Sequence, residues 1–192
     1  KEYNISRQEQ DRWAAISQQR AYECKENQRL KDEIVPVSVP QKKGEDILVA
    51  EDEQIRANVT KESLSKLNGI FFEGNTVTAG NAPATNDGAS ALLLASESKA
   101  KELNLKPLAT ILDHAYVSKD SPYIVDVPGE SIVKLLEKND LTVDDIDLFE
   151  INEAFAAVVN RSLQIVDIPE DKLNVTGGAI AYGCLLYTSD AA

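Results

Sequence analysis

The sequence predicts an α/β protein whose sheet is mostly parallel and carries helices on both faces. Short runs of apolar and β-branched residues alternate with segments of helical periodicity, in the order strand, helix, strand, helix, strand. The links between them are short, so successive strands should be joined by right-handed crossovers. One run, residues 146–151, stops at the polar pair Asn152 and Glu153, and an alanine-rich segment follows.

Composition narrows the range of functions. The chain has 192 residues, of which 43% are hydrophobic and 27% charged, as in an ordinary globular domain. Its net charge of −12 argues against a nucleic-acid partner, because neutralising phosphates needs a basic surface. No window approaches the roughly 18 uninterrupted apolar residues of a membrane span. We therefore expect a protein that works on neither nucleic acid nor membrane.

The cysteines and the missing methionines are also informative. Cys24 and Cys184 lie far apart and give neither a disulfide framework nor a zinc spacing. They suit a reducing compartment, so a cytoplasmic location and no metal site are expected. The chain contains no methionine, not even at position 1. This predicts a piece cut from a longer protein.

The first predicted element is an amphipathic helix. Ser6 and Glu9 have the spacing of a capping box, which marks a helix start. Trp13, Ile16, Arg20 and Cys24 then fall near one side of a helix that should run to about residue 27. Cys24 is predicted to be a half-buried small hydrophobe rather than a nucleophile, because no histidine lies near it in the sequence.

The next stretch should be more irregular. Two prolines restrict residues 33–40 to an edge strand at best, and the charged, aperiodic residues 41–56 suggest a surface excursion. Thr60 is placed to cap a short helix that contains Leu64 and Leu67.

Residues 74–88 read as a β-branched strand and a loop of small residues, followed by a helix over 89–103. Such a loop allows close approach of backbone or ligand, but it matches neither a dinucleotide fingerprint nor a phosphate-binding loop. A tight turn is the favoured interpretation on composition alone.

Strand and helix then alternate to the end. Residues 106–117 are predicted as a strand that holds the single histidine, His114, as a structural residue among apolar neighbours. Pro128 should open a helix through residue 138, and a turn at 142–145 should lead into the strand 146–151. A helix follows to about residue 164, and a last strand at 173–176 ends at two glycines.

Asn152 and Glu153 are the candidate functional residues. They are predicted to lie where a strand ends and a helix begins, the place where open α/β sheets bind ligands. A buried amide and carboxylate need hydrogen-bond partners. The pair is therefore either structural or catalytic, and the sequence pattern alone does not choose.

Five blocks of the sequence resemble the thiolases, in the right order and with plausible spacing. They are NISRQEQD at 4–11, KDEIVP at 31–36, TVTAGN with NDGA at 76–81 and 86–89, NEAF at 152–155, and NVTGGAIA at 174–181. The resemblance covers residues 1–183 and is greatest to the acetyl-CoA acetyltransferases. It implies an incomplete thiolase-like α/β fold: residues 1–104 as the end of the N-terminal domain with part of its loop region, and 105–183 as a truncated C-terminal domain.

The resemblance also implies an activity in lipid metabolism. Thiolases condense two acetyl-CoA molecules to acetoacetyl-CoA in a Claisen reaction and catalyse the thiolytic reverse. The implied substrates are acyl-CoA thioesters, with no further cofactor, and the full-length protein is expected to be a homo-oligomer.

Roles for individual residues follow from matching the blocks. The asparagine matching Asn152 holds a water that, with a histidine, stabilises the thioester oxygen, whereas Glu153 is expected to fix the junction by hydrogen bonds. The residues expected to line coenzyme A and the acyl group are Phe71, Ala79, Gly80, Pro83, Ala154 and Phe155. Two positions depart from the family: Pro83 stands where many members have serine, and Ile124 where biosynthetic members can have methionine.

The family's main catalytic groups are expected outside this chain. The nucleophilic cysteine matches a segment before Lys1 and the second cysteine a segment beyond the end, while Cys184 stands where the Gly-His-Pro motif has its histidine. Residues 184–192 resemble a translated sequencing adapter rather than thiolase. Neither Cys184 nor His114 is then catalytic, and the chain alone should be inactive.

Other functions remain possible from the sequence. A non-catalytic coenzyme A-binding or assembly fragment describes the chain alone, and a longer-chain 3-ketoacyl-CoA thiolase has the same blocks. A decarboxylating ketoacyl synthase is disfavoured, because those enzymes use two histidines and lack the NEAF block.

Overall fold

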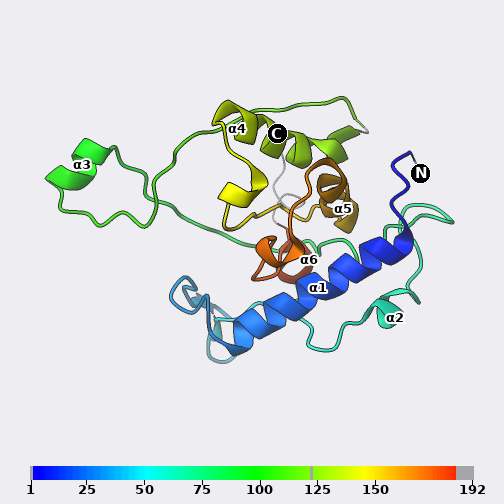
Figure 1. The fold of residues 1–192 in the computed structure, drawn as a ribbon. Helices are drawn as coiled ribbons and strands as arrows, with labels where there is room; N and C mark the ends of the chain where they lie inside the picture. The colour runs from blue at the N-terminus through cyan, green and yellow to red at the C-terminus, as the bar shows by residue number, and fades with distance from the viewer. Residues whose placement is uncertain (1, 122, 185–192) are drawn as a thin grey trace.

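The computed structural model describes residues 2–121 and 123–184, and its longest element is helix α1 (Arg7–Glu26). Helices α5 (Ala156–Ile165), α6 (Ala179–Tyr182) and α2 (Lys61–Leu64) pack on α1, and α4 (Val127–Lys138) packs on α5 (Figure 1). Three short 3₁₀ turns complete this part of the chain: Tyr123–Asp126, Val143–Asp145 and Glu170–Lys172.

Helix α1 forms where the sequence predicts it. The Ser6 hydroxyl accepts from the Glu9 N–H at 3.1 Å, and the Glu9 carboxylate accepts from the Ser6 N–H at 2.7 Å. These two bonds satisfy backbone donors that a helix start leaves unpaired. The helix ends at Asn27 as its C-cap, so both predicted boundaries are confirmed.

The core lies between α1, α5 and two extended segments. Trp13, Val159 and Leu173 are fully buried at its centre, with Phe149 and Ile151 beside them. The remaining buried members are Ala14, Ala15, Leu64, Ala156, Val158, Val166, Ile168 and Ile180. The core thus brings the first helix against the last third of the chain.

A single hairpin is the only continuous sheet among the described residues. Strand β1 (Val37–Val39) pairs antiparallel with β2 (Ile47–Val49), and Val37 lies opposite Val49. The predicted edge strand is confirmed at β1. Residues 41–56 contain no buried residue, as expected of a surface excursion, and β2 lies within them.

The predicted parallel strands meet only at isolated bridges. Phe149 and Leu173 form a parallel bridge, with the Phe149 N–H donating to Lys172 at 2.8 Å and Phe149 accepting from the Asn174 N–H at 2.9 Å. The segments 146–151 and 173–176 therefore run side by side in parallel, as expected. Neither is a continuous strand, because a ladder needs partners along its whole length and a single bridge joins these two segments.

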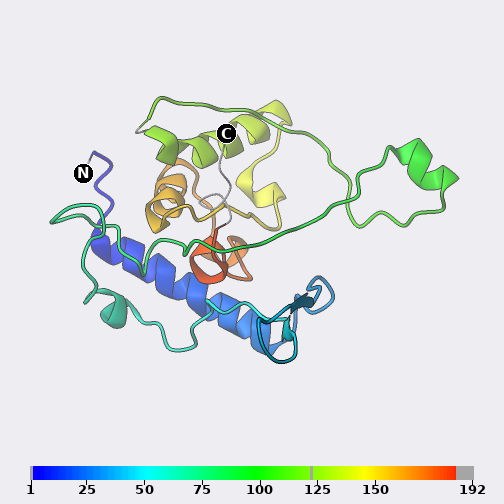
Figure 2. The same cartoon turned by 180° about the vertical axis from the view of Figure 1, so that it is seen from behind.

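Residues 88–120 form a long excursion from the body, with α3 (Glu97–Glu102) at its tip (Figures 1 and 2). The helix predicted over 89–103 is wrong for 89–96, and the strand predicted over 106–117 is absent. Short apolar segments form regular structure only when they pack against another surface. The outer part of the excursion is open to solvent, with Leu92 and Leu108 89% and 101% exposed, whereas its returning part is joined to α4 by hydrogen bonds from Lys134 to Tyr116 and from Lys138 to Asp113.

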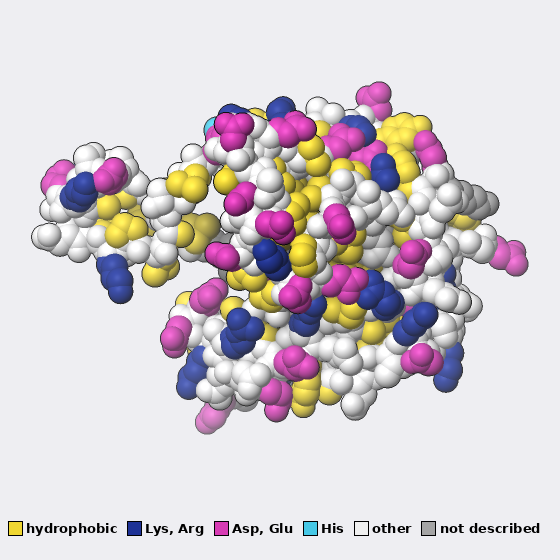
Figure 3. Space-filling view, in the orientation of Figure 1, with side chains coloured by type: hydrophobic (Ala, Val, Ile, Leu, Met, Phe, Trp, Pro, Cys, Tyr) yellow, Lys and Arg dark blue, Asp and Glu magenta, His cyan; other side chains and the backbone are white. Residues whose placement is uncertain are grey.

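His114 lies on this excursion, and its predicted environment is corrected. Its side chain is exposed and its ring meets that of Tyr116 edge-on at 5.2 Å between centroids. A histidine within a packed apolar strand was expected, but the segment is not a strand, and the His114 ring contacts Tyr116 while remaining exposed. Figure 3 shows hydrophobic side chains open to view along the same excursion.

The remaining elements differ from prediction mainly at their ends. Helix α4 has its proline in the first turn, and Thr60 caps α2, both as predicted, although Leu67 lies beyond the end of α2. Helix α5 begins at Ala156, later than expected. Helix α6 was not predicted, because only four residues follow its glycine N-cap.

Candidate functional site

The site is centred on a fully buried carboxylate, that of Glu153. It accepts hydrogen bonds from the Trp13 indole Nε1 at 2.9 Å and the Ser17 hydroxyl at 2.7 Å, both on α1. It also accepts from the Asn174 amide at 3.1 Å and the Ile180 N–H at 3.0 Å. Four neutral donors thus replace the water that a buried carboxylate loses.

The double glycine at 177–178 allows this close approach. A Cβ on Gly178 would lie 2.4 Å from the Glu153 carboxyl carbon, and one on Gly177 would lie 2.7 Å from the Cβ of Ala21. Gly177 also has φ +85°, which disfavours side chains. The Gly178 N–H donates to the Ser17 hydroxyl at 3.1 Å, so α1 and the glycines are directly joined.

Asn152, the neighbour of Glu153, has the opposite environment. Its side chain is exposed, and no hydrogen bond joins it to another described residue. Phe155, in an extended conformation, is the N-cap of α5. Asn152 and Glu153 therefore lie in an irregular connection before α5 and not in its first turn, which corrects the predicted strand-to-helix junction.

Two groups of residues predicted to line the substrate lie next to each other. The rings of Phe71 and Phe155 meet edge-on with centroids 6.3 Å apart. The backbone oxygen of Asn81 accepts from the Ala156 N–H at 3.0 Å. The small-residue loop and the start of α5 are thus in direct contact.

The other members of this set differ in exposure. Ala79 is exposed, whereas Pro83 and Ala154 are half-buried. A Cβ on Gly80 would lie 2.5 Å from the Cδ2 of Leu64 and 2.6 Å from the Cδ1 of Leu67, so a larger residue there would require these two leucine side chains to shift. No hydrogen bond connects Asn152 to these residues among the described part of the chain.

A second buried polar cluster anchors the loop on α1. The Asn81 amide donates to Asp11 at 2.9 Å and accepts from the Thr78 N–H at 2.8 Å. Asp11, 1% exposed, also accepts from Arg7 at 2.7 Å. Asp11 and Asn81 were not among the expected site residues, although both stand in the blocks that resemble the thiolases.

The last described residue also contacts the loop. The Cys184 N–H donates to Ala84 at 2.9 Å, and Cys184 forms a parallel bridge with Thr85. The thiol-bearing residue is 5% exposed. Residues 185–192, and with them most of the segment predicted to be an adapter, lie outside the described residues.

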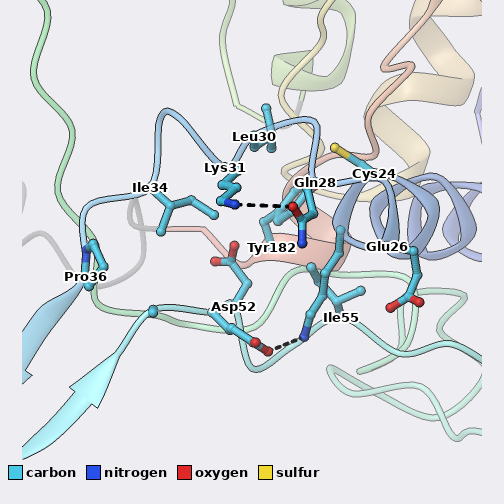
Figure 4. A pocket seen from close by; sticks show the side chains of 13 residues that line it. Cys24, Glu26, Gln28, Leu30, Lys31, Ile34, Pro36, Asp52, Ile55 and Tyr182 are labelled. Atoms are coloured by element: carbon cyan, nitrogen blue, oxygen red, sulfur yellow. Dashed lines mark hydrogen bonds and ion pairs between the residues drawn. The ribbon is translucent and has the colours of Figure 1, made fainter.

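A separate cavity of about 580 Å³ opens at the end of α1 (Figure 4). Cys24, Asp52 and Tyr182 line it, and none of the predicted site residues does. Cys24 is 2% exposed, so it is fully buried where half burial was expected. Burial, followed by hydrogen bonding with Cys24, raises the pKa of Tyr182, whose hydroxyl donates to Thr176 at 2.6 Å.

Burial and the charge of Glu153 also affect the pKa of a neighbouring carboxyl group, that of Glu150. Partial burial raises the pKa of Glu150, and the charge of Glu153 raises it further, while Arg20 opposes both. Within residues 2–121 and 123–184 no group of three metal-ligating side chains is placed to hold an ion. None of the helices described there is long and apolar enough to cross a membrane.

Helices and extended segments thus meet at a buried polar junction. Two family models match the sequence of this chain. The thiolase N-terminal domain matches residues 1–98 and the thiolase C-terminal domain matches residues 105–191. The chain belongs to the thiolase family.

Relatives with known names extend the comparison. The chain is 47% identical over 185 residues to a probable acetyl-CoA acyltransferase of Staphylococcus aureus strain MRSA252, and 48% identical to that of strain MW2. These matches cover 95% of this chain but 46% of each relative. The chain therefore spans about half the length of the curated relatives it matches.

Two solved structures have a similar fold. The acetyl-CoA acetyltransferase of Bacillus anthracis aligns with a TM-score of 0.91 and 38% identity, over 96% of this chain and 46% of its own. The dimeric peroxisomal thiolase of Saccharomyces cerevisiae aligns with a TM-score of 0.89 and 41% identity, over 95% and 46%. The predicted thiolase-like α/β class is confirmed, as part of a larger fold.

Proposed function

We propose that this chain is part of an acetyl-CoA C-acetyltransferase, which condenses two acetyl-CoA to acetoacetyl-CoA and runs the thiolytic reverse. The observation that supports this most directly is the contrast between neighbours: Asn152 is exposed, and Glu153 is fully buried with four donors. A fixed backbone with one free amide suits a group that stabilises developing charge. The names of the Staphylococcus aureus relatives agree with acyl transfer.

Asn152 would act on the oxygen of the reacting thioester. In the condensation, a base removes an α-proton from acetyl-CoA, and the resulting carbon attacks the carbonyl of an acetylated cysteine. A carbon–carbon bond forms, the carbon–sulfur bond breaks, and the cysteine leaves as a thiolate. Negative charge gathers on the oxygen meanwhile, and the Asn152 amide would hold a water that donates to it. We place both reactive cysteines and the histidine outside this chain.

The residues expected to line coenzyme A and the acyl group belong to the same proposal. Phe71, Ala79, Gly80 and Pro83 would line the pantetheine arm, and Ala154 with Phe155 the acyl end. The ring contact between Phe71 and Phe155 and the hydrogen bond from Ala156 to Asn81 support this, because they join the two groups. Pro83 cannot supply a hydroxyl to the pantetheine amides, which sets it apart from many thiolases.

A specific observation favours a second candidate, a non-catalytic coenzyme A-binding or assembly fragment. Both cysteines of the described chain are buried, at 2% and 5% exposure, and His114 lies on the excursion. The described residues therefore present no exposed thiol to a substrate. A longer-chain 3-ketoacyl-CoA thiolase would use the same lining residues, with more space for the acyl chain at Ala154 and Phe155.

The proposal also covers the oligomeric state and the cellular location of the whole protein. The yeast structure is described as dimeric, which supports a homo-oligomer for the whole protein. A cytoplasmic location rests on the two widely separated free cysteines.

A hybrid enzyme tests the proposal. Residues 1–183 of this chain replace the matching segment of the Staphylococcus aureus MRSA252 relative, so that the position of Cys184 and all later positions keep the relative's own residues. Thiolysis of acetoacetyl-CoA is measured for the hybrid and for the isolated chain. The hybrid should be active and the isolated chain inactive. Asn152→Ala should lower kcat of the hybrid roughly 100-fold with little change in KM, since removing one oxyanion donor costs about that much.

Asn139→Ala is the control, because Asn139 is an exposed C-cap at the end of α4. It should leave kcat of the hybrid unchanged. An Asn152→Ala hybrid with undiminished kcat would contradict the assigned role. Binding of coenzyme A by the isolated chain, combined with an inactive hybrid, would favour the second candidate.

A further inference from the structure

Asn174 contacts the residues on both sides of Asn152. Its side-chain oxygen accepts from the Ile151 N–H at 2.8 Å, and its amide nitrogen donates to the Ile151 oxygen at 2.8 Å. The same nitrogen donates to Glu153 at 3.1 Å. One side chain, itself 1% exposed, thus holds the backbone before Asn152 and the side chain after it.

The chemistry of an amide suits this position. Asparagine carries a donor and an acceptor side by side, and so can pair with the N–H and the C=O of a single residue. Asn174 also has φ +45°, a left-handed conformation that asparagine tolerates better than most residues. Its own backbone N–H donates to Phe149 and its oxygen accepts from Gly177, so the conformation is fixed from both sides.

Glu153 extends this arrangement to α1. Trp13 and Ser17 are one helical turn apart, and both donate to the Glu153 carboxylate. Ser17 accepts from the Gly178 N–H in addition. The junction is therefore held against a helix of 20 residues, the longest rigid element in the described structure.

We propose that Asn174 is a positioning residue for Asn152, acting through Ile151 and Glu153, with Trp13 and Ser17 as its support on α1. The proposal deepens the proposed function, on which the catalytic value of Asn152 rests. Because the Asn152 side chain has no described hydrogen bond of its own, its direction is set by the backbone that Asn174 holds. A misplacement of about 1 Å can cost roughly 100-fold in rate.

The test measures the order of Asn152 directly, in the complete 192-residue chain labelled with ¹⁵N. Asn174→Asp keeps the size and one acceptor, but an ionised carboxylate cannot donate to Ile151 or Glu153 and repels the latter. The order parameter of the Asn152 backbone amide should fall from the rigid range near about 0.85 to below about 0.6. Lowering the pH should restore it, because the protonated carboxyl can donate again.

Asn174→Gly is the second variant, since glycine adopts the left-handed conformation without strain. It should loosen Asn152 equally and show no recovery at low pH, because glycine has no side chain to protonate. Asn160→Asp is the matched control, because Asn160 is also buried but lies on α5. It should leave the order of Asn152 unchanged.

Should both variants at 174 fail to fold, Ser17→Ala removes one donor to Glu153 and should loosen Asn152 in the same direction, less strongly. Unchanged order of Asn152 in every folded variant would overturn the proposal. The hybrid enzyme separates this from the proposed function: Asn174→Gly should lower kcat there without raising KM. If the variants at 174 lower the order of Asn152 but Asn152→Ala does not change turnover of the hybrid, the positioning role of Asn174 stands. The catalytic role of Asn152 is then refuted.

Discussion

The indole N–H of Trp13 lies 2.9 Å from the carboxylate of Glu153, a residue 140 positions away in the sequence. Both side chains are fully buried. Arg20 lies 5.7 Å above the Trp13 ring, so the indole has a cation on its face and a carboxylate at its edge. This contact ties the first helix to the junction that carries Asn152, and it leads to the first prediction.

Trp13→Phe should destabilise the chain by about 1–2 kcal/mol, because it leaves Glu153 with one donor fewer in a buried place. Urea unfolding followed by far-UV circular dichroism measures the change without relying on tryptophan fluorescence. Arg12→Ala is the control: its ion pair with Glu170 is largely exposed, and such pairs contribute about 0–1 kcal/mol. Equal losses in the two variants would refute the importance of the Glu153 contact.

Gly178→Ala should be strongly destabilising, by about 2–4 kcal/mol, because backbone must shift to separate the new Cβ from a fully bonded carboxylate. Gly88→Ala provides the comparison, since a Cβ at Gly88 meets nothing within 4 Å. Thermal unfolding of both variants distinguishes them. Similar melting temperatures would mean that Glu153 can move, contrary to its four hydrogen bonds.

The free energy of unfolding should fall at low pH, because the Asp126 carboxylate becomes protonated. Burial acts to raise the pKa of this carboxyl, but hydrogen bonds from Arg161, Lys119 and Tyr3 outweigh it and hold the pKa at about 2, below the ordinary 3.8. A lowered folded-state pKa gives stability that is present above about pH 4 and lost as the pH falls towards 2.

Asp126→Asn removes this carboxylate, and should cost about 1–3 kcal/mol at pH 7. Between pH 4 and 2 its stability should change less than that of the unaltered chain. Urea titrations at a series of pH values test both statements. Parallel pH profiles for the two proteins would show that other carboxylates dominate the acid transition.

The isolated chain should associate through the excursion at 88–120. Leu92, Leu93, Leu108 and Leu112 are 85–101% exposed there, and exposed apolar patches of this kind drive association. Light scattering should report mass that rises with concentration. Replacing Leu92, Leu108 and Leu112 together with serine should reduce it, whereas Leu48→Ser on the hairpin should not. A monodisperse monomer would contradict the prediction.

Local features were predictable from the sequence. The capping box at Ser6, the cap at Thr60 and the first-turn proline of α4 depend on residues a few positions apart, and each lies where expected. The alternation of strands and helices predicted the α/β class, and the thiolase resemblance added the particular fold, since five ordered blocks are more specific than a hydrophobic period. The parallel adjacency of 146–151 and 173–176 also followed from the expected topology.

Longer-range features could not be read from residue patterns. Nothing in the sequence around Trp13 or Ser17 indicates that their acceptor is Glu153, because the pairing depends on how the chain returns to α1. The β-branched run at 106–117 has strand propensity, but propensity does not form a strand without a neighbouring partner. Asn174 stands in one of the five blocks, yet its two hydrogen bonds to the N–H and C=O of Ile151 become apparent only in the folded structure.

The contacts of α1 also bear on the time course of folding. Its capping box is local and can form within the first ten residues, yet Trp13, Ser17 and Gln18 bond to residues 136–162 positions later. Contacts of such high sequence separation slow folding. During synthesis the helix should therefore emerge early with its buried face open, and become fixed only after residue 180 has left the ribosome.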